Sequence, residues 1–591
     1  MKFSEMQYTR PDVPKILQQY QDATERFQKA HSAEEQLSIY RELEAVNTDI
    51  ETNMTLCSIR NSIDTRDSFY AAEQDYCDEN TPLLEEAQHV FEAALLASPY
   101  REKLEQQLGT LLFQNLEMTQ KSFSPKITKL IQQENALQTQ YQKLYASAKI
   151  TFDGKDCNIA QLEPYKQSTE RQVRRAALEA EGSFFDEHQK EFDELFDALV
   201  KNRTEQAQTL GYESYVELAY MRRLRNCYDA KAVANFRSQV IRHVVPVVGE
   251  IKQAQAQRLG LKRLTFCDDA LSFPDGNAVP QGTPEQLLEA GREMYREMSP
   301  ETAAFIDQMF QMELFDVLAK DGKAPGGYCT DLPGYHCPFI FSNFNGTSAD
   351  VNVLTHEAGH AFASYLADRT ISIAALRQPT MEACETHSMS MEFLTSPWHH
   401  LFFQEQTEKY AISHAEGALV FLPYGCMVDH FQELVYASPD MTPEARNQAW
   451  LKLESTYRPY QDFDNLPFYS RGAGWQRQLH IYLYPFYYID YCLAQTTALQ
   501  IWSAARKDAK AAWQQYFSFV KMGGTKTFLR LLETTHLRSP FAPGCLQEVA
   551  AETKTWLDNA YAELAQHTKL IFKSTFSGRW AVEKRILENA P

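Results

Sequence analysis

The 591-residue sequence lacks several features that would assign it to common classes of protein. Its eleven cysteines form no C-x-x-C pair, and an odd number of scattered cysteines is typical of reduced thiols. The N-terminal residues open no apolar segment, and no apolar run approaches the roughly 20 residues that cross a bilayer. We therefore expect a cytoplasmic protein with no signal peptide and no membrane partner.

The sequence also has no excess of basic residues. It contains 58 Lys and Arg against 78 Asp and Glu, which gives a net charge of −20. Affinity for nucleic acid comes mainly from basic contacts with phosphates, so we expect no nucleic-acid partner. A composition of 44% hydrophobic and 23% charged residues is typical of a globular protein with a sizeable core. The oligomeric state stays open.

Helical periodicity dominates the first 145 residues. The segments that predict long antiparallel helices are 12–30, 33–63, 67–97, 100–119 and 124–146. A β-like interruption follows at 149–159, where Asp153-Gly154 predicts the turn of a short hairpin. We divide the chain into N-terminal antiparallel helices (1–110), a helical region with the hairpin (111–200) and a large C-terminal region (201–591).

The most informative motif is His356-Glu357-Ala358-Gly359-His360. Two histidines four residues apart on a helix project from one face, so both imidazoles can reach one metal ion. Glu357 lies about 100° around the helix from His356, where it can act on a metal-bound water without being a ligand. The composition gives roughly 0.05 accidental matches to H-E-x-x-H per chain, so the pattern indicates a zinc hydrolase.

The residues around the motif predict a strand followed by a helix. Thr347 and Asp350 form a capping-box pattern, and apolar residues then recur at helical spacing to about residue 367. The β-branched and aromatic run 338–344 precedes them and predicts a strand. As an edge strand it could pair with an extended peptide; an ordinary buried strand is an equal alternative.

A third metal ligand is expected downstream, because a hydrolytic zinc site usually has three protein ligands and one open position. Residues 380–392 predict a second helix that carries Glu382 and Glu385 on roughly one face. One could bind the metal while the other orients a ligand, and the spacing does not choose between them. His387 points away and is better read as a satisfied polar residue.

An aromatic cluster lies nearer the C-terminus. Six of the 30 tyrosines fall between residues 469 and 491, where a uniform spread would place about one. Tyrosine hydroxyls in a dry site can stabilise an oxyanion, although packing of the aromatic faces explains most of them. The loop 469–475 contains Gly472 and Gly474 and could serve as a mobile cover.

These motifs together resemble a known family. Asn345-Gly346-Thr347 followed by residues 356–361 is similar to the metal helix of the thimet oligopeptidase and oligoendopeptidase F family of metallopeptidases. The segment 385–389 resembles the second motif of that family, whose leading glutamate is the third zinc ligand. The resemblance covers about residues 110–580. It implies a mainly α, two-lobed helical body with a deep channel and a small β-sheet beside the metal helix.

The resemblance also assigns roles to residues. It implies that one Zn²⁺ per chain is held by three ligands, which are His356, His360 and Glu385. The family carries a histidine and a series of tyrosines that line the cleft opposite the zinc. The residues that match this series are His480, Tyr484, Tyr488 and Tyr491, with Tyr487 competing with Tyr488 for its position. Pro485 departs from the glycine-rich form of the thimet branch, so the chain looks closer to the bacterial oligoendopeptidase F branch.

The resulting hypothesis is a zinc oligoendopeptidase, with residues 201–591 as its catalytic region. Glu357 would act as general base, and His480 with the tyrosines would stabilise the oxyanion. The family architecture implies short unfolded peptides as substrates. A carboxypeptidase or dipeptidyl carboxypeptidase is the alternative, and it would need a cation such as Arg471 or Arg477 to hold the C-terminal carboxylate. A peptide-binding module with a non-catalytic metal site is a weaker alternative.

Overall fold

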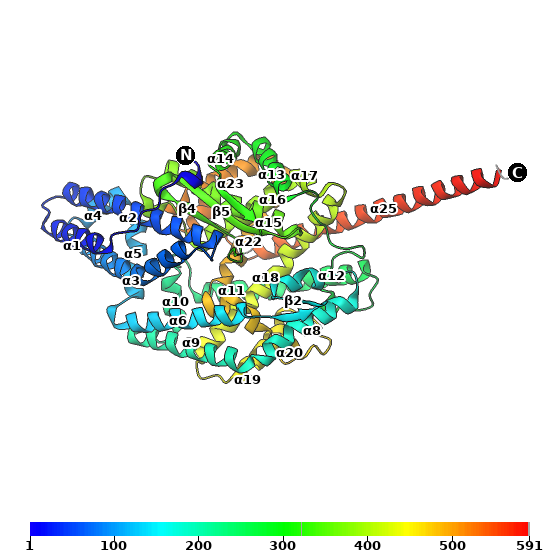
Figure 1. The fold of residues 1–591 in the computed structure, drawn as a ribbon, viewed down its shortest axis with the longest axis horizontal. Coiled ribbons are helices and arrows are strands. Elements are labelled where there is room, and N and C mark those ends of the chain that lie inside the picture. Colours follow the sequence, from blue (N-terminus) through cyan, green and yellow to red (C-terminus); the bar gives the residue numbers. More distant parts are fainter. Residues whose placement is uncertain (321, 589–591) are drawn as a thin grey trace.

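The computed structural model describes residues 1–320 and 322–588, with side chains described up to residue 566. Most of the chain is helical, and two small β-sheets complete the fold (Figure 1). In this view one group of elements lies above and another below, and the long helix α18 (Thr407–Ala437) packs against helices of both groups. The predicted mainly α, two-lobed body is confirmed. Residues 589–591 of the predicted catalytic region lie outside the described residues.

The N-terminal helices project to one side of this body (Figure 1). They are α1 (Val13–Lys29), α2 (Ala33–Ile63), α3 (Ser68–Leu96), α4 (Arg101–Leu108) and α5 (Thr110–Ser122). The single helix expected over 100–119 is wrong, because Gly109 separates α4 from α5. Its φ of 92° lies in a region that glycine adopts without steric penalty, and the chain changes direction there.

The middle of the chain forms the lower group of helices. They are α6 (Thr128–Ala146), α7 (Glu163–Lys166), α8 (Arg171–Glu187), α9 (Gln189–Thr209), α10 (Tyr215–Arg222), α11 (Ala230–His243) and α12 (Val245–Arg258). The predicted hairpin is present as β1 (Ile150–Phe152) and β2 (Lys155–Cys157), paired antiparallel around Asp153 and Gly154. The domain boundaries at residues 110 and 200 stay predictions, and α9 continues through residue 200.

A three-stranded sheet lies beside the metal-binding motif. Its strands are β3 (Phe315–Leu318), β4 (Tyr328–Leu332) and β5 (Cys337–Phe344), in the order β3-β5-β4. The predicted strand is therefore β5, which is buried in the centre, parallel to β3 and antiparallel to β4. The edge beside the motif belongs to β4 instead, which pairs with no second strand among the described residues.

The sheet leads directly into helix α15 (Ser348–Thr370), which carries the H-E-x-x-H motif. Thr347 is its N-cap, as predicted, and the hydroxyl oxygen accepts a hydrogen bond from the Ala349 amide. The Asp350 carboxylate accepts hydrogen bonds from the amides of Asn345 and Gly346 and so holds the preceding turn rather than the N-cap residue. The helix runs a few residues beyond the predicted end near residue 367.

Helix α16 (Met381–Leu394) packs against α15 and is the predicted second helix. A Cβ at Gly359 would lie 2.6 Å from Ser388 Cα, so only glycine permits this approach of the two helices. The remaining helices are α13 (Pro284–Met298), α14 (Pro300–Gln311), α17 (His400–Phe403), α19 (Pro443–Tyr457), α20 (Pro467–Ser470), α21 (Leu479–Leu483), α22 (Tyr488–Lys507), α23 (Ala509–Val520), α24 (Phe528–Thr534) and α25 (Cys545–Glu588).

One helical segment requires a qualification of the expectation about membranes. Within the described residues, His400–Ala437 is long and apolar enough to cross a bilayer by length and composition. Of its most apolar window, 61% is buried inside the protein. The segment contains α18, whose packing against both groups of helices explains its apolar composition as that of a core helix.

Candidate active site

Three candidate metal ligands meet between α15 and α16. His356 and His360 lie one turn apart on α15, and Glu385 faces them from α16. Their ligand atoms all lie within 4.8 Å of one another, and Glu385 Oε2 is 3.3 Å from His356 Nε2 and 3.6 Å from His360 Nε2. Two imidazole nitrogens and one carboxylate oxygen form a donor set that suits zinc.

Glu357 stands in the wall of the same cavity. Burial raises the pKa of its carboxyl group, and the nearby imidazoles of His356 and His360 oppose this shift. The cavity has a volume of about 410 Å³ and is also lined by residues 327–331, which include most of the edge strand β4. A carboxylate with a raised pKa beside a metal site is suited to accept and return a proton.

A second carboxylate, Glu392, contacts the candidate ligand His356 and a further histidine, His414. Its Oε1 lies 2.7 Å from His356 Nδ1, and its Oε2 lies 2.8 Å from His414 Nε2. Burial opposes ionisation of Glu392, but these two histidines lower its pKa to about 2. With Nδ1 held by Glu392, His356 presents Nε2 to the cavity. The sequence interpretation assigned no role to Glu392.

The two alternatives to Glu385, which are Glu382 and His387, also lie on α16. Glu382 is buried against Asp490, and this burial raises its pKa to about 8. It accepts a hydrogen bond from Thr380 and contacts neither histidine of the motif. His387 lies against the ring of Phe519, and its Nε2 has no hydrogen-bond partner among the described residues. His387 also lines the active-site cavity, so the expectation that it points away from the site is wrong.

Of the candidate tyrosines, two line the cavity. Tyr487 Oη donates a 2.5 Å hydrogen bond to Glu385 Oε1, and the rings of Tyr487 and Tyr491 are 4.8 Å apart. Tyr488 packs between Phe421 and Tyr424 and does not line the cavity. The register that favoured Tyr488 over Tyr487 is thus not the one the structure shows.

Tyr484 does not line the cavity either, and its side chain is 50% exposed at the end of α21. The turn that follows explains both misplaced residues. Helix α21 ends at Leu483, Phe486 has a φ of 62°, and α22 begins at Tyr488. This turn interrupts helical spacing between residues 480 and 488, which had been matched to the family series by their order along the sequence.

His480 lies beside these tyrosines, with its ring centroid 5.9 Å from that of Tyr487 and 6.0 Å from that of Tyr491. Burial and the nearby Arg223 lower its pKa to about 4, so the imidazole is neutral at pH 7. Gln478 Nε2 is 2.9 Å from His480 Nδ1 and donates to it, which leaves the proton on Nε2. His480 itself does not line the cavity.

The loop 469–475 is packed into the lower group of helices and does not cover the site. Trp475 is fully buried and donates a hydrogen bond to Asn447, and a Cβ at Gly472 would lie 2.3 Å from Asn447 O. The two arginines proposed to hold a substrate carboxylate are already paired. Arg471 contacts Asp186 at 2.5 Å, and Arg477 lies 3.5 Å from Glu181.

Comparison with protein families gives two matches along the chain. Residues 3–123 match the model described as the Peptidase M3 N-terminal domain, and residues 164–551 match that of Peptidase family M3. Oligopeptidase PepF of Bacillus subtilis (strain 168) is 22% identical over 381 residues, which cover 61% of this chain and 53% of that protein. The match therefore spans about half the length of this curated relative.

Solved structures match over almost the whole chain. The structure of PZ peptidase A with inhibitor 2 has 46% identity and a TM-score of 0.91, covering 94% of this chain and 99% of the other. A putative oligoendopeptidase F from Bacillus anthracis str. Ames has 43% identity and a TM-score of 0.86, covering 95% and 98%.

Proposed function

Because the chain belongs to peptidase family M3, we propose that it is a zinc-dependent oligoendopeptidase acting on internal bonds of short unfolded peptides. The observation that carries this proposal is the meeting of His356, His360 and Glu385 in one cavity, with Glu357 in its wall. A single such ion per chain is expected, since the described residues contain one group of this kind.

The candidate ligands suit zinc in their number and in the hydrogen bond that orients one of them. Three protein ligands leave one coordination position for water or substrate, as in hydrolytic zinc sites. Glu392 fixes the orientation of His356, which is the usual support for a ligating imidazole. When bound, zinc would supply Lewis-acid polarisation of the scissile carbonyl and a water of lowered pKa.

The protein side chains would move the protons. Glu357 would take the proton of the attacking water and later return it to the leaving amine. Its raised pKa brings it closer to the pH at which such an exchange is efficient.

The oxyanion would be stabilised by the hydroxyl of Tyr491, while Tyr487, which donates its hydroxyl proton to Glu385 Oε1, would hold that ligand in place. Both tyrosines line the cavity, and burial raises the pKa of each, so both remain protonated at pH 7. Neutral His480, close to both rings, would position them. This assignment replaces Tyr488 and Tyr484 by Tyr487.

The open edge of β4 supports an endopeptidase rather than a carboxypeptidase. An extended peptide can add to such an edge through main-chain hydrogen bonds on both sides of the scissile bond. The carboxypeptidase alternative loses its two named cations, which pair with Asp186 and Glu181.

The proposal also includes the partners of the protein and its location in the cell. Short peptides are the expected partners, and the charge of −20 supports the expectation of no nucleic-acid partner. A cytoplasmic location is supported by eleven cysteines that are all free thiols.

Cleavage mapping by mass spectrometry tests the proposal. A mixture of short peptides and one folded protein would be incubated with the parent and with Glu357→Gln. We expect internal cuts in the peptides alone, lost in the variant. Products shortened only from the C-terminus would support a carboxypeptidase, and cuts in the folded protein would contradict the restriction to short peptides.

A further inference from the structure

A second cavity extends the active-site cavity into the N-terminal helices. It has a volume of about 520 Å³ and shares four lining residues with the first, which are Thr48, Glu51, Ala374 and Gln378. Helices α2, α3 and α5 form most of its walls, with residues 374–378 at its junction with the metal site. A peptide that leaves the metal site in this direction therefore enters a space already present in the fold.

The lining of this second cavity combines apolar surface with negative charge. Leu84, Phe91 and Leu112 contribute the apolar part. The carboxylates in its wall are Glu44, Glu51, Glu85 and Glu92. Among the described residues that line it there is no lysine, arginine or histidine.

The protein balances the charge in this cavity only in part, since Arg377 opposes the rise in the pKa of Glu51 and His89 opposes that of Glu85. No described residue forms a hydrogen bond or ion pair with the carboxylate of Glu51 or Glu85, and burial raises the pKa of both. Glu92 is only 8% exposed. Its Oε1 accepts a hydrogen bond from Gln88, while its Oε2 accepts none and has His89 Nδ1 at 3.4 Å. Carboxylates in this state favour a cation that arrives with a ligand.

The direction of the bound peptide follows from β4. The strand runs from Tyr328 to Leu332, and Asp331 near its C-terminal end lines the active-site cavity together with Glu51. The two carboxylates are close enough for the charge of Asp331 to raise the pKa of Glu51. A peptide pairing antiparallel with β4 would have its N-terminal part at this end of the strand. Its upstream residues would then point toward the second cavity.

We propose that this cavity, which we call the acidic chamber, binds the part of the substrate upstream of the scissile bond and selects a positively charged ammonium group there. The group can be the free α-amino terminus or an upstream lysine, and the apolar walls hold the neighbouring side chains. The inference rests on the proposed peptidase function and adds a substrate preference that the metal site alone does not supply.

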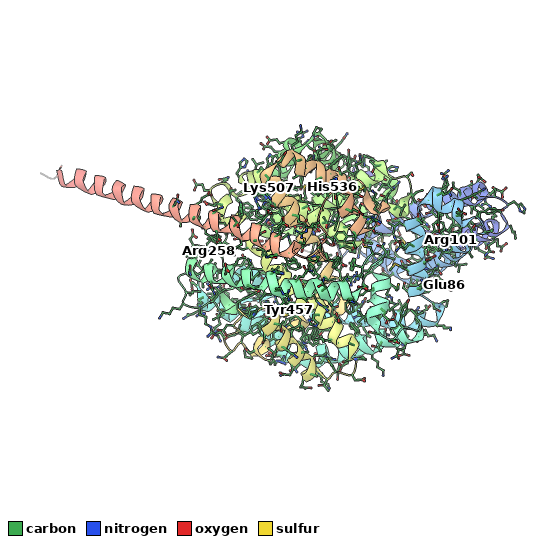
Figure 2. The ribbon with its side chains drawn as sticks, turned by 180° about the vertical axis from the view of Figure 1, so that it is seen from behind. Glu86, Arg101, Arg258, Tyr457, Lys507 and His536 are labelled. Carbon is green, nitrogen blue, oxygen red and sulfur yellow. The ribbon has the colours of Figure 1, made fainter. Side chains whose placement is uncertain are left out.

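Two glutamates on α3 provide a matched pair for the test. Glu85 lines the chamber, whereas its neighbour Glu86 does not. Figure 2 shows Glu86 and Arg101 on the N-terminal group of helices, away from the centre of the body. Glu85→Gln and Glu51→Gln remove charge from the chamber, and Glu86→Gln removes the same charge outside it.

The experiment measures kcat/KM for peptides that differ only upstream of one scissile bond. The set contains a lysine or a glutamate at successive upstream positions, each with a free or an acetylated N-terminus. We expect the parent to prefer the cationic peptides, and each chamber substitution to reduce this preference about 5-fold or less, in line with a partly exposed charge pair. Glu86→Gln should keep the preference of the parent. Acetylation and lysine replacement distinguish the two sources of the ammonium group.

Several outcomes would overturn the inference without touching the peptidase function. These are equal cleavage of cationic and anionic peptides, a preference that survives Glu51→Gln with Glu85→Gln, or a lysine effect found only downstream of the cut. If the parent cleaves no peptide, the peptidase function fails instead. Binding of the same peptides to Glu357→Gln would then still test the chamber, because affinity for the cationic peptides requires no turnover.

Discussion

The metal helices and the aromatic segment differ in how far spacing along the sequence determines the site. On α15 and α16, the residues predicted to meet do meet: the ligand atoms of His356, His360 and Glu385 lie within 4.8 Å of one another. In the aromatic segment, the predicted Tyr484 and Tyr488 point elsewhere, and Tyr487 takes the position. Regular helices transmit spacing faithfully, whereas a turn between two helices resets it.

The largest difference in activity should be found between glutamine substitutions of two glutamates on the same helix. Glu385→Gln removes a proposed ligand and should lower kcat/KM by about 10³-fold or more, together with the zinc content. Glu382→Gln should retain one zinc and activity near that of the parent, because a carboxyl group with a pKa of about 8 is mostly protonated at pH 7 and resembles an amide. Metal analysis and peptide kinetics measure both. Equal losses in the two variants would remove the distinction between Glu385 and Glu382.

Substitutions of the neighbouring Tyr487 and Tyr488 test which of the two tyrosines belongs to the site in the aromatic segment. Tyr487→Phe removes the hydroxyl that donates to the proposed ligand Glu385 and should lower kcat/KM about 10- to 100-fold, as loss of a group that orients a metal ligand does. Tyr488→Phe should leave kcat/KM close to that of the parent, since the ring packs between Phe421 and Tyr424. If Tyr488→Phe were the damaging substitution, the register in the structure would be contradicted.

A substitution of Glu392 tests whether this carboxylate supports the proposed ligand His356. Glu392→Gln weakens the support of His356 and should reduce zinc affinity about 10- to 100-fold. A chelator competition assay measures this affinity, and Glu382→Gln on the same helix is the control. An unchanged affinity would mean that Glu392 serves only the packing of α16.

The smallest effect is expected outside both regions, where buried charges serve stability alone. Burial opposes ionisation of Asp268, but hydrogen bonds from Arg171 and Arg174 lower its pKa to about 2, against 3.8 ordinarily. A lowered folded pKa gives stability that is present above pH 3.8 and is lost as the pH falls toward 2, by roughly 2 kcal/mol. Unfolding measured across this range should show the loss in the parent and a smaller one in Asp268→Asn. An identical slope in both would exclude Asp268 as a source of acid sensitivity.

Much of the metal site could be predicted because its residues sit on two regular helices. The sequence interpretation placed both histidines and Glu357 from periodicity, and chose Glu385 over Glu382 only through the family resemblance. Glu392 was missed although a signal existed. It follows Glu385 by seven residues, two helical turns along the same face, and could therefore have been expected to face α15.

The remainder depended on contacts that a sequence does not display. Gly109 and Phe486 adopt positive φ values that end one helix early and shift the aromatic register. The edge position of β4 follows from the strand order β3-β5-β4, in which the last strand along the chain lies between the two strands that precede it. The pairing of Arg471 and Arg477 with acids far away in the chain likewise required the fold.

The central claim is that Glu357 performs proton transfer at a metal site built by His356, His360 and Glu385. The most direct measurement compares zinc stoichiometry and peptide turnover in the parent and in Glu357→Gln. We predict one zinc per chain in both proteins, with turnover in the variant lowered by about 10²- to 10⁴-fold, the contribution of a general base. Full turnover in Glu357→Gln, or a parent that cleaves peptides without bound metal, would contradict the account.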